Sequence, residues 1–169
     1  MKKMQIDQGI IRPIRLEDNQ ALAHIIRGVF IEHSAEQEGT VYSDPSTDDL
    51  YGLFQEQNSV LWVAEQNGKV VGCCGIFPTL GLPEKCAELV KYYIDSSARG
   101  IGVGRALMEK CILSAQQMGF SQVYIESLPD FEKAIGIYKK QGFRSLSEPM
   151  TKFGHPGCNL WFLKDLVAS

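Results

Sequence analysis

The sequence has no long apolar run and no lysine or arginine between Arg27 and Lys69. A helix that crosses a bilayer needs roughly 20 apolar residues, so we predict no membrane span. The first residues, 1–7, form no apolar signal region. The five cysteines are odd in number and follow no zinc-ligand spacing. We therefore expect reduced thiols, a cytoplasmic location and no bound metal.

Strong positive charge is also missing, since the formal net charge is −3. Surfaces that follow nucleic-acid phosphates need clustered lysine and arginine, so we expect no nucleic-acid partner. The segment without basic residues contains eight acidic ones: Glu32, Glu36, Glu38, Asp44, Asp48, Asp49, Glu56 and Glu65. They form either a solvated helix face with a turn-rich loop or an acidic rim that attracts a cationic amine, and the sequence leaves both interpretations open.

The pattern of elements predicts one mixed α/β (α+β) domain over residues 1–169. Asn67-Gly68 lies between two apolar runs and indicates a β-hairpin. In the helix expected at 131–141, Phe131, Ala134, Ile135 and Tyr138 fall on one face. We expect strands at 10–15, 60–65, 70–77, 88–95, 122–126, 143–145 and 159–163, and helices at 17–27, after residue 46, at 102–118 and at 131–141.

Three glycines stand between the strand that ends near Ile94 and the following helix: Gly100, Gly102 and Gly104. Glycine adopts backbone dihedrals that are closed to other residues and lets the chain approach a ligand closely. The first N–H groups of a helix have no partner inside it. Together these features predict an anion site, and we expect a pyrophosphate there.

The spacing of these glycines argues against two other nucleotide sites. A Rossmann fingerprint needs Gly-x-Gly-x-x-Gly, but the third position holds Arg105 in one register and Leu107 in the other. The Gly-Lys-Ser/Thr of a phosphate loop is absent. A dinucleotide-binding oxidoreductase is therefore a weakened alternative.

The run Arg99-x-x-Gly102-x-Gly104 resembles the Arg/Gln-x-x-Gly-x-Gly/Ala loop of the GNAT (Gcn5-related N-acetyltransferase) superfamily. The strand at 87–95 resembles the family's fourth strand, and 134–143 is similar to its Ala-x-x-x-Tyr-x-x-x-Gly-Phe ending. The resemblance implies a mostly antiparallel central sheet flanked by helices, with strands that splay at the cofactor site. It also implies acetyl transfer from acetyl-CoA to a primary amine by direct attack.

The same resemblance assigns residues to acetyl-CoA. Backbone groups of the loop would hold the pyrophosphate, Arg99 and Arg105 would add positive charge, and Tyr93 and Ile94 would bind the pantetheine amides through their backbone. The loop residues concerned are Gly100, Ile101, Gly102, Val103 and Gly104. One departure is Phe131, which stands where many members place a cofactor-binding asparagine.

Acetylation of an amine calls for a base and an acid. An alkyl ammonium with a pKa of about 10.4 is neutral in roughly one molecule in a few thousand at pH 7. By resemblance Glu88 is the general base, with Glu126 in reserve, although Glu88 could also be a solvent-facing carboxylate. Tyr138 takes the place of the family's general acid, or else it is a core tyrosine.

The acceptor is the least specified part. His155 precedes the last strand and is a candidate substrate-binding residue, with a surface turn as the alternative. We expect a small-molecule amine or a lysine-bearing peptide as acceptor, with no membrane partner. Exposed edge strands permit a homodimer. The main alternative function is a non-catalytic acyl-CoA-binding module.

Overall fold

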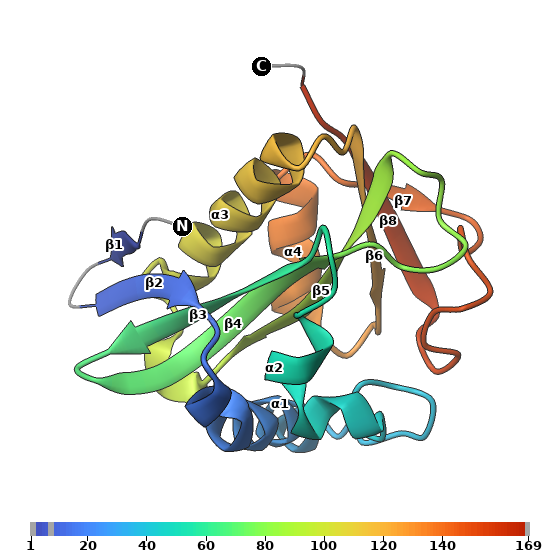
Figure 1. Ribbon diagram of the computed structural model, residues 1–169. Coiled ribbons are helices and arrows are strands. Elements are labelled where there is room, and N and C mark those ends of the chain that lie inside the picture. The colour runs from blue at the N-terminus through green and yellow to red at the C-terminus, as the bar shows by residue number, and fades with distance from the viewer. Residues whose placement is uncertain (1–2, 7–8, 168–169) are drawn as a thin grey trace.

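A single eight-stranded sheet runs through the protein in the order β1-β2-β3-β4-β5-β6-β8-β7 (Figure 1). The computed structural model describes residues 3–6 and 9–167. The strands are β1 (Met4–Ile6), β2 (Gly9–Pro13), β3 (Val60–Gln66), β4 (Lys69–Phe77), β5 (Cys86–Ile94), β6 (Gln122–Ser127), β7 (Arg144–Leu146) and β8 (Leu160–Asp165). All neighbouring pairs are antiparallel except β5 and β6, which are parallel. The predicted fold class, a mixed and mostly antiparallel sheet with helices, is confirmed.

Two helices cover each face of this sheet (Figure 1). The helices are α1 (Asn19–Glu32), α2 (Leu50–Leu53), α3 (Val103–Gln117) and α4 (Glu132–Lys140), and 3₁₀ turns occur at Leu16–Asp18, Pro45–Asp48 and Ser96–Ala98. α3 and α4 bury their apolar side chains against one face, and α1 and α2 bury theirs against the other. The second predicted helix proves to be a single turn, capped by Asp49, whose carboxylate accepts a hydrogen bond from the Gly52 N–H at 3.0 Å.

The sequence predicted the Asn67-Gly68 turn correctly, but the apolar face of the helix expected at 131–141 incorrectly. Asn67 and Gly68 have φ of +50° and +76° and join β3 to β4 as predicted. Phe131 does not share a face with Ala134 and Tyr138, because α4 begins only at Glu132. Phe131 instead packs in the core beneath α1, while Ala134 and Tyr138 pack in the core beneath α3. Strand β1 was not expected from the sequence.

β5 and β6 pair over a short distance and then separate. Only Cys86, Ala87 and Glu88 of β5 pair with β6, opposite Gln122 to Tyr124. Beyond this point β5 stays with β4 as far as Ile94, and β6 stays with β8 as far as Ser127. The sheet therefore opens into a wedge on one side of Glu88, which is the predicted splay.

A β-bulge interrupts β5 beside this wedge. Cys73 pairs with Tyr93 and Gly75 pairs with Val90, so β5 has one residue more than β4 in this interval. Lys91 lies in the bulge with φ of +56°, a conformation that is uncommon for residues other than glycine. The extra residue changes the alternation of side chains along the rest of β5.

Two global expectations concern membranes and thiols. In the described part of the chain, no helix combines the length and apolarity that a bilayer crossing requires. All five cysteines are free thiols.

A buried ion pair fixes β2 to the start of α1. The Arg12 guanidinium binds both oxygens of Asp18 at 2.8 and 3.0 Å, and both side chains are almost fully buried. Arg12 also binds Glu65 of β3 at 2.9 Å. Burial pushes the pKa of Asp18 upward, but the hydrogen bonds from Arg12 and from the Arg15 N–H outweigh burial and lower it.

We predict that Asp18→Ala lowers the free energy of unfolding by about 3 kcal/mol, because it leaves the Arg12 cation buried with only Glu65 as partner. Urea denaturation measures this loss. Asp48→Ala, which breaks the solvent-exposed pair with Arg27, serves as control and should change stability far less. Equal losses in the two variants would show that burial does not decide the energy of these pairs.

Candidate functional site

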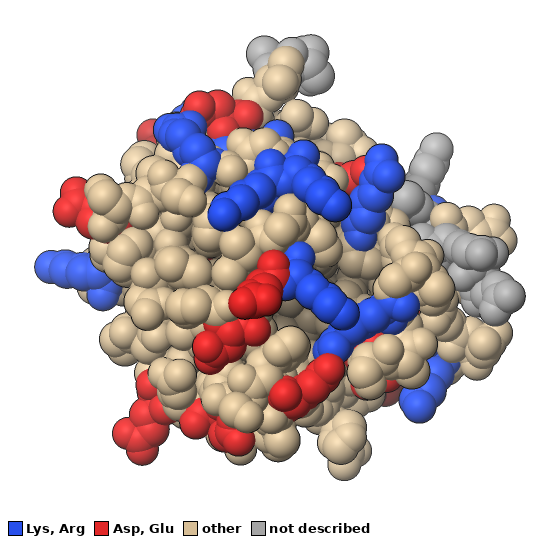
Figure 2. All heavy atoms as spheres, turned by 180° about the vertical axis from the view of Figure 1, so that it is seen from behind, with Lys and Arg blue, Asp and Glu red and all other residues tan. Residues whose placement is uncertain are grey.

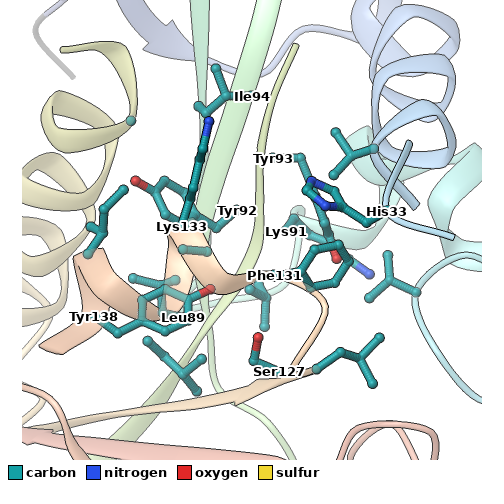
Figure 3. A pocket seen from close by; sticks show the side chains of 18 of the residues that line it. His33, Leu89, Lys91, Tyr92, Tyr93, Ile94, Ser127, Phe131, Lys133 and Tyr138 are labelled. Atoms are coloured by element: carbon teal, nitrogen blue, oxygen red, sulfur yellow. The ribbon is translucent and has the colours of Figure 1, made fainter. Parts of the chain in front are cut away.

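A cavity of about 520 Å³ occupies the wedge between β5 and β6 (Figure 3). Its wall comes from α1, β5, β6, the start of α3, α4 and the loop before β8. From behind, the molecule shows a hollow with lysine and arginine gathered beside it (Figure 2). The cavity brings together ten of the residues singled out in the sequence: Glu88, Tyr93, Ile94, Arg99, Gly100, Gly102, Gly104, Arg105, Tyr138 and His155, and with them the reserve base Glu126.

The glycine loop forms one end of the cavity. Gly100 and Gly102 have φ of +77° and +89°, so both require the left-handed conformation that glycine tolerates. Gly102 is the N-cap of α3, and no side chain among the described residues caps the free N–H groups of the first turn. These N–H groups and the positive end of the helix dipole form an anion site of the predicted kind.

Tyr92 adds a donor that the sequence did not reveal. Its hydroxyl is a buried polar atom without a hydrogen-bond partner among the described residues. A Cβ atom built on Gly104 would lie 2.8 Å from this hydroxyl, so the glycine keeps the space beside it open. A buried hydroxyl without a partner is costly, and a polar group of a ligand at the start of α3 would satisfy it. This cradle fits the phosphate end of acetyl-CoA.

The arginines beside the loop differ in their surroundings. Arg99 binds both oxygens of Glu32 at 2.6 and 2.8 Å, and its Nε donates to the Ile94 carbonyl oxygen at 3.1 Å. Arg99 therefore joins the end of β5 to α1. Arg105 makes an exposed ion pair with Glu109 of the same helix, and its side chain is free to turn toward a phosphate.

Ile101 and Val103 do not reach the cavity with their side chains. The Ile101 side chain is exposed, and Val103 is buried in the core under α3. The prediction that these two residues bind the cofactor therefore rests on their backbone groups alone. Lys133, which the sequence analysis did not select, also lines the cavity (Figure 3).

Glu88 lies at the other end of the cavity, where β5 and β6 part. Its side chain is 6% exposed, and Thr79 Oγ1 donates a hydrogen bond to Glu88 Oε1 at 2.6 Å. Burial raises the pKa of Glu88 to about 7, and the negative charge of Glu126 adds to the rise. This carboxylate is not solvent-facing, so that alternative is wrong. A carboxyl group with this pKa can accept and release a proton near neutral pH.

Glu126, the reserve candidate, is held by two hydrogen bonds. The Tyr124 hydroxyl donates to Oε2 and the His155 N–H donates to Oε1, both at 2.8 Å. The His155 ring binds Asp44 at 3.0 Å. Burial pushes the pKa of Asp44 upward, but the hydrogen bonds from His155 and Ser46 outweigh burial and hold it at about 2. His155 thus connects the segment before α2 to the cavity wall.

Tyr138 lies in the cavity wall and in the core at once. It is 5% exposed, and its ring packs against Tyr92, Phe143 and Phe162 with centroids 5.6–6.1 Å apart. Burial raises the pKa of Tyr138, and its hydrogen bond with Ser127 opposes only part of the rise. The phenol is therefore protonated at neutral pH. Figure 3 shows Tyr138 and Ser127 on the same side of the cavity.

Several residues of the cavity, and one contact beside it, escaped the sequence analysis. Tyr92 and Lys91 belong to a strand in which only alternation could be inferred, and the bulge changes that alternation. Asp44 meets His155 across 111 residues of sequence, so no local signal connects them. Among the described residues, no group of three or more histidine, cysteine or acidic side chains is placed to hold a metal ion.

A glycine loop at a helix start, a splayed sheet and a cavity that ends at a buried glutamate are the features that the resemblance predicted for an acyl-CoA-dependent acyltransferase. The comparison with known families agrees. A model described as the acetyltransferase (GNAT) family matches residues 28–143, more than half of the chain. The chain therefore belongs to the GNAT acetyltransferase family, and acetyl-CoA is the co-substrate that this membership implies.

Related proteins cover the chain to different extents. It is 32% identical to YjgM of Escherichia coli K12, named an uncharacterised N-acetyltransferase, over 98% of this chain and 100% of that protein. It is 33% identical to human N-acetyltransferase 8B over 56% of this chain. The matched part spans 43% of the human protein, less than half of its length.

Solved structures share the fold. The crystal structure of a GNAT acetyltransferase from Staphylococcus aureus Mu50 has a TM-score of 0.81 at 18% identity and covers 93% of this chain and 98% of its own. YncA from Salmonella typhimurium, solved with its cofactor acetyl-CoA, has a TM-score of 0.74 at 20% identity and covers 96% of each chain.

We predict that Gly102→Glu weakens binding of acetyl-CoA and of CoA at least tenfold, because the carboxylate repels the phosphates and the loop loses its left-handed residue. Titration calorimetry measures both ligands. Gly119→Glu is a matched control, since Gly119 lies at the other end of α3 with φ of +90° and equally open surroundings. Both variants should lose similar stability, but only Gly102→Glu should lose CoA. Preferential binding of NAD⁺ would overturn the assignment of the loop.

Proposed function

We propose that the protein transfers an acetyl group from acetyl-CoA directly to a primary amine, with Glu88 as general base and Tyr138 as general acid. The observation that carries the proposal is the buried Glu88 carboxyl, with a pKa of about 7, at the end of the cavity remote from the glycine loop. The six residue steps from Glu88 to Ile94 span about 20 Å of extended strand. An extended pantetheine arm along β5 would bring the thioester toward Glu88.

Glu88 would take a proton from the acceptor ammonium, directly or through a water. The neutral amine then forms a bond to the acetyl carbon while the carbon–sulfur bond breaks. The nitrogen gives up its second proton, which replaces the proton that Tyr138 donates to the sulfur, and Glu88 later releases the first proton to water. Thr79 holds one oxygen of Glu88 and leaves the other free for the proton. A pKa of about 7 means that roughly half of the molecules carry the carboxylate at pH 7, so the base is both available and strong enough.

Tyr138 would donate its proton to the sulfur that leaves. A thiolate released in a buried site is costly unless it is protonated, and the Tyr138 phenol lies in the cavity wall. Its packing in the core fixes the ring. Tyr138 can therefore be a core tyrosine and a general acid at the same time.

Direct transfer is favoured over a covalent acetyl-cysteine. Cys158 lines the cavity, but burial raises the pKa of its thiol to about 12, with further rises from Glu126 and Glu88. A thiol with such a pKa supplies almost no thiolate at neutral pH. The competing function, a non-catalytic acyl-CoA-binding module, would retain binding without turnover and would not need a base with a shifted pKa.

We predict that Glu88→Gln lowers kcat/KM by about 10²–10⁴-fold, because the amide cannot accept the proton. Only the carboxylate is active, so the ratio of wild-type to variant activity should rise with pH up to about 7 and then level off. The rate of thiol release is measured for both proteins over pH 5.5–9. Protonation of the acceptor affects both rates equally, so it does not change the ratio of wild-type to variant activity.

Glu126→Gln is the control for this experiment. It should keep the step near pH 7, since Glu126 is engaged by Tyr124 and His155. A step that disappears in Glu126→Gln and persists in Glu88→Gln would identify Glu126 as the base. Acetyl-CoA binding with no thiol release for any amine would favour the non-catalytic module.

We predict that Tyr138→Phe lowers kcat by about 10²-fold or more while the melting temperature and the Kd for acetyl-CoA stay nearly unchanged. The variant keeps the ring contacts and removes the hydroxyl together with its hydrogen bond to Ser127. Tyr51→Phe, on α2 and outside the cavity lining, is the matched control. Full activity of Tyr138→Phe would leave the tyrosine with a packing role alone.

A further inference from the structure

Lys91 is an ionisable residue of the cavity that the acetyl transfer described above does not use. It is 5% exposed and lies in the wall, three residues after Glu88 on β5 (Figure 3). Lysine is almost never this buried without a partner, because removal of an ammonium from water costs several kcal/mol. The burial of Lys91 in the cavity wall therefore calls for a physical explanation.

The bulge in β5 aims Lys91 at the acceptor end. Leu89 and Tyr92 pack in the core under α3, whereas Val90 and Tyr93 pack in the core under α1. Strict alternation would send Lys91 to the same side as Leu89. The extra residue instead leaves Lys91 on the α1 side, where its charge interacts with Asp44, Glu88 and Cys73. Re-aiming of a side chain is what bulges beside active sites do.

The Lys91 ammonium has no hydrogen bond or ion pair with any residue that the structure describes. The nearby carboxylates have other partners. Asp44 binds the His155 ring at 3.0 Å and the Ser46 N–H at 2.9 Å, and Glu88 binds Thr79. Burial lowers the pKa of Lys91, and the charges of Asp44 and Glu88 oppose this only through space. The cavity thus presents a cationic donor, on an almost fully buried side chain, whose hydrogen-bonding capacity no described residue uses.

We propose that Lys91 binds a carboxylate of the acceptor, so that the acceptor is a small amine that also bears a carboxylate, such as a free amino acid. This inference rests on the proposed acetyl transfer. Glu88 and Lys91 interact electrostatically and face the same side of β5, so one small molecule can place its amine at Glu88 and its carboxylate at Lys91. The carboxylate would give the ammonium the charge-assisted partner that it lacks.

The charges around the cavity favour this acceptor over a polyamine. The eight acidic residues between Arg27 and Lys69 do not line the cavity in the part of the chain that the structure describes. Four of them are paired elsewhere: Glu32 with Arg99, Asp44 with His155, Asp48 with Arg27 and Glu65 with Arg12. A polyamine would bring a second positive charge close to Lys91 without an unpaired carboxylate to receive it.

The test compares acceptors that differ only in the carboxylate. Acetylation rates are measured for a panel of amino acids, for the corresponding amino acid amides and for a diamine. The amide is a stringent comparison, because loss of the negative charge lowers the pKa of its amine and leaves more of it neutral. We expect wild-type kcat/KM to be at least tenfold higher for acids than for their amides, a difference of about 1.4 kcal/mol.

Variants of Lys91 connect the preference to this side chain. Lys91→Met, similar in length and apolar, should raise KM for the acids at least tenfold and leave KM for the amides unchanged. Lys91→Arg should retain the preference for acids. Lys85→Met, at an exposed lysine just before β5, is the matched control and should behave as wild type. Thermal melts of all variants exclude unfolding as the cause.

Two results would separate failure of this inference from failure of the proposed function. Equal rates for acids, amides and diamine, or a Lys91→Met effect that is the same for acids and amides, would overturn the carboxylate contact while acetyl transfer stands. Absence of turnover for every acceptor would count against acetyl transfer. In that case calorimetry still tests the contact between Lys91 and the carboxylate. The amino acid is titrated into the CoA complexes of the wild-type protein and of the Lys91→Met variant, and equal affinities would overturn the contact.

Discussion

β5 and β6 pair over three residues and then separate, and the site depends on this parting. If β6 paired with the whole of β5, both edges of β5 would form backbone hydrogen bonds, and no space would remain between the two strands. Once β6 turns away with β8, the second half of β5 keeps β4 as its only neighbouring strand, and side chains from α1 and α4 form the remaining walls. The cavity is thus a consequence of strand pairing. The apolar cores under α3 and under α1 remain packed on either side of it.

Within this wedge the two ends differ in electrostatic character. The glycine loop offers unpaired N–H groups, the helix dipole and the exposed Arg105, which suits phosphates. The far end holds Glu88 and Lys91, both almost fully buried, and each has its pKa displaced by burial toward the neutral form. A molecule with phosphates at one end and a reactive thioester at the other matches this gradient in one orientation only.

The sequence predicted the features whose causes are local. The glycine loop, the Asn67-Gly68 hairpin and the order of elements follow from backbone conformation and periodicity, which neighbouring residues determine. The resemblance to the GNAT family supplied Glu88 and Tyr138. The direction of the Lys91 side chain could not be predicted, because one extra residue in β5 reverses the side of the strand to which Lys91 points. The His155–Asp44 contact joins residues 111 positions apart, and the shift of Phe131 to the α1 core depends on where α4 begins.

Glu88 and Lys91 also depend on one another. Each lies in the low-dielectric end of the cavity, and the positive charge of Lys91 lowers the pKa of Glu88 against the larger effect of burial. An acceptor carboxylate bound to Lys91 would neutralise that charge and exclude water from the same space. Both changes raise the pKa of Glu88 and make it a stronger base when the amine arrives. An acceptor without the carboxylate would leave Lys91 charged and Glu88 weaker. The bulge that aims Lys91 would then contribute to proton transfer as well as to acceptor choice, although Lys91 itself touches neither the amine nor the thioester.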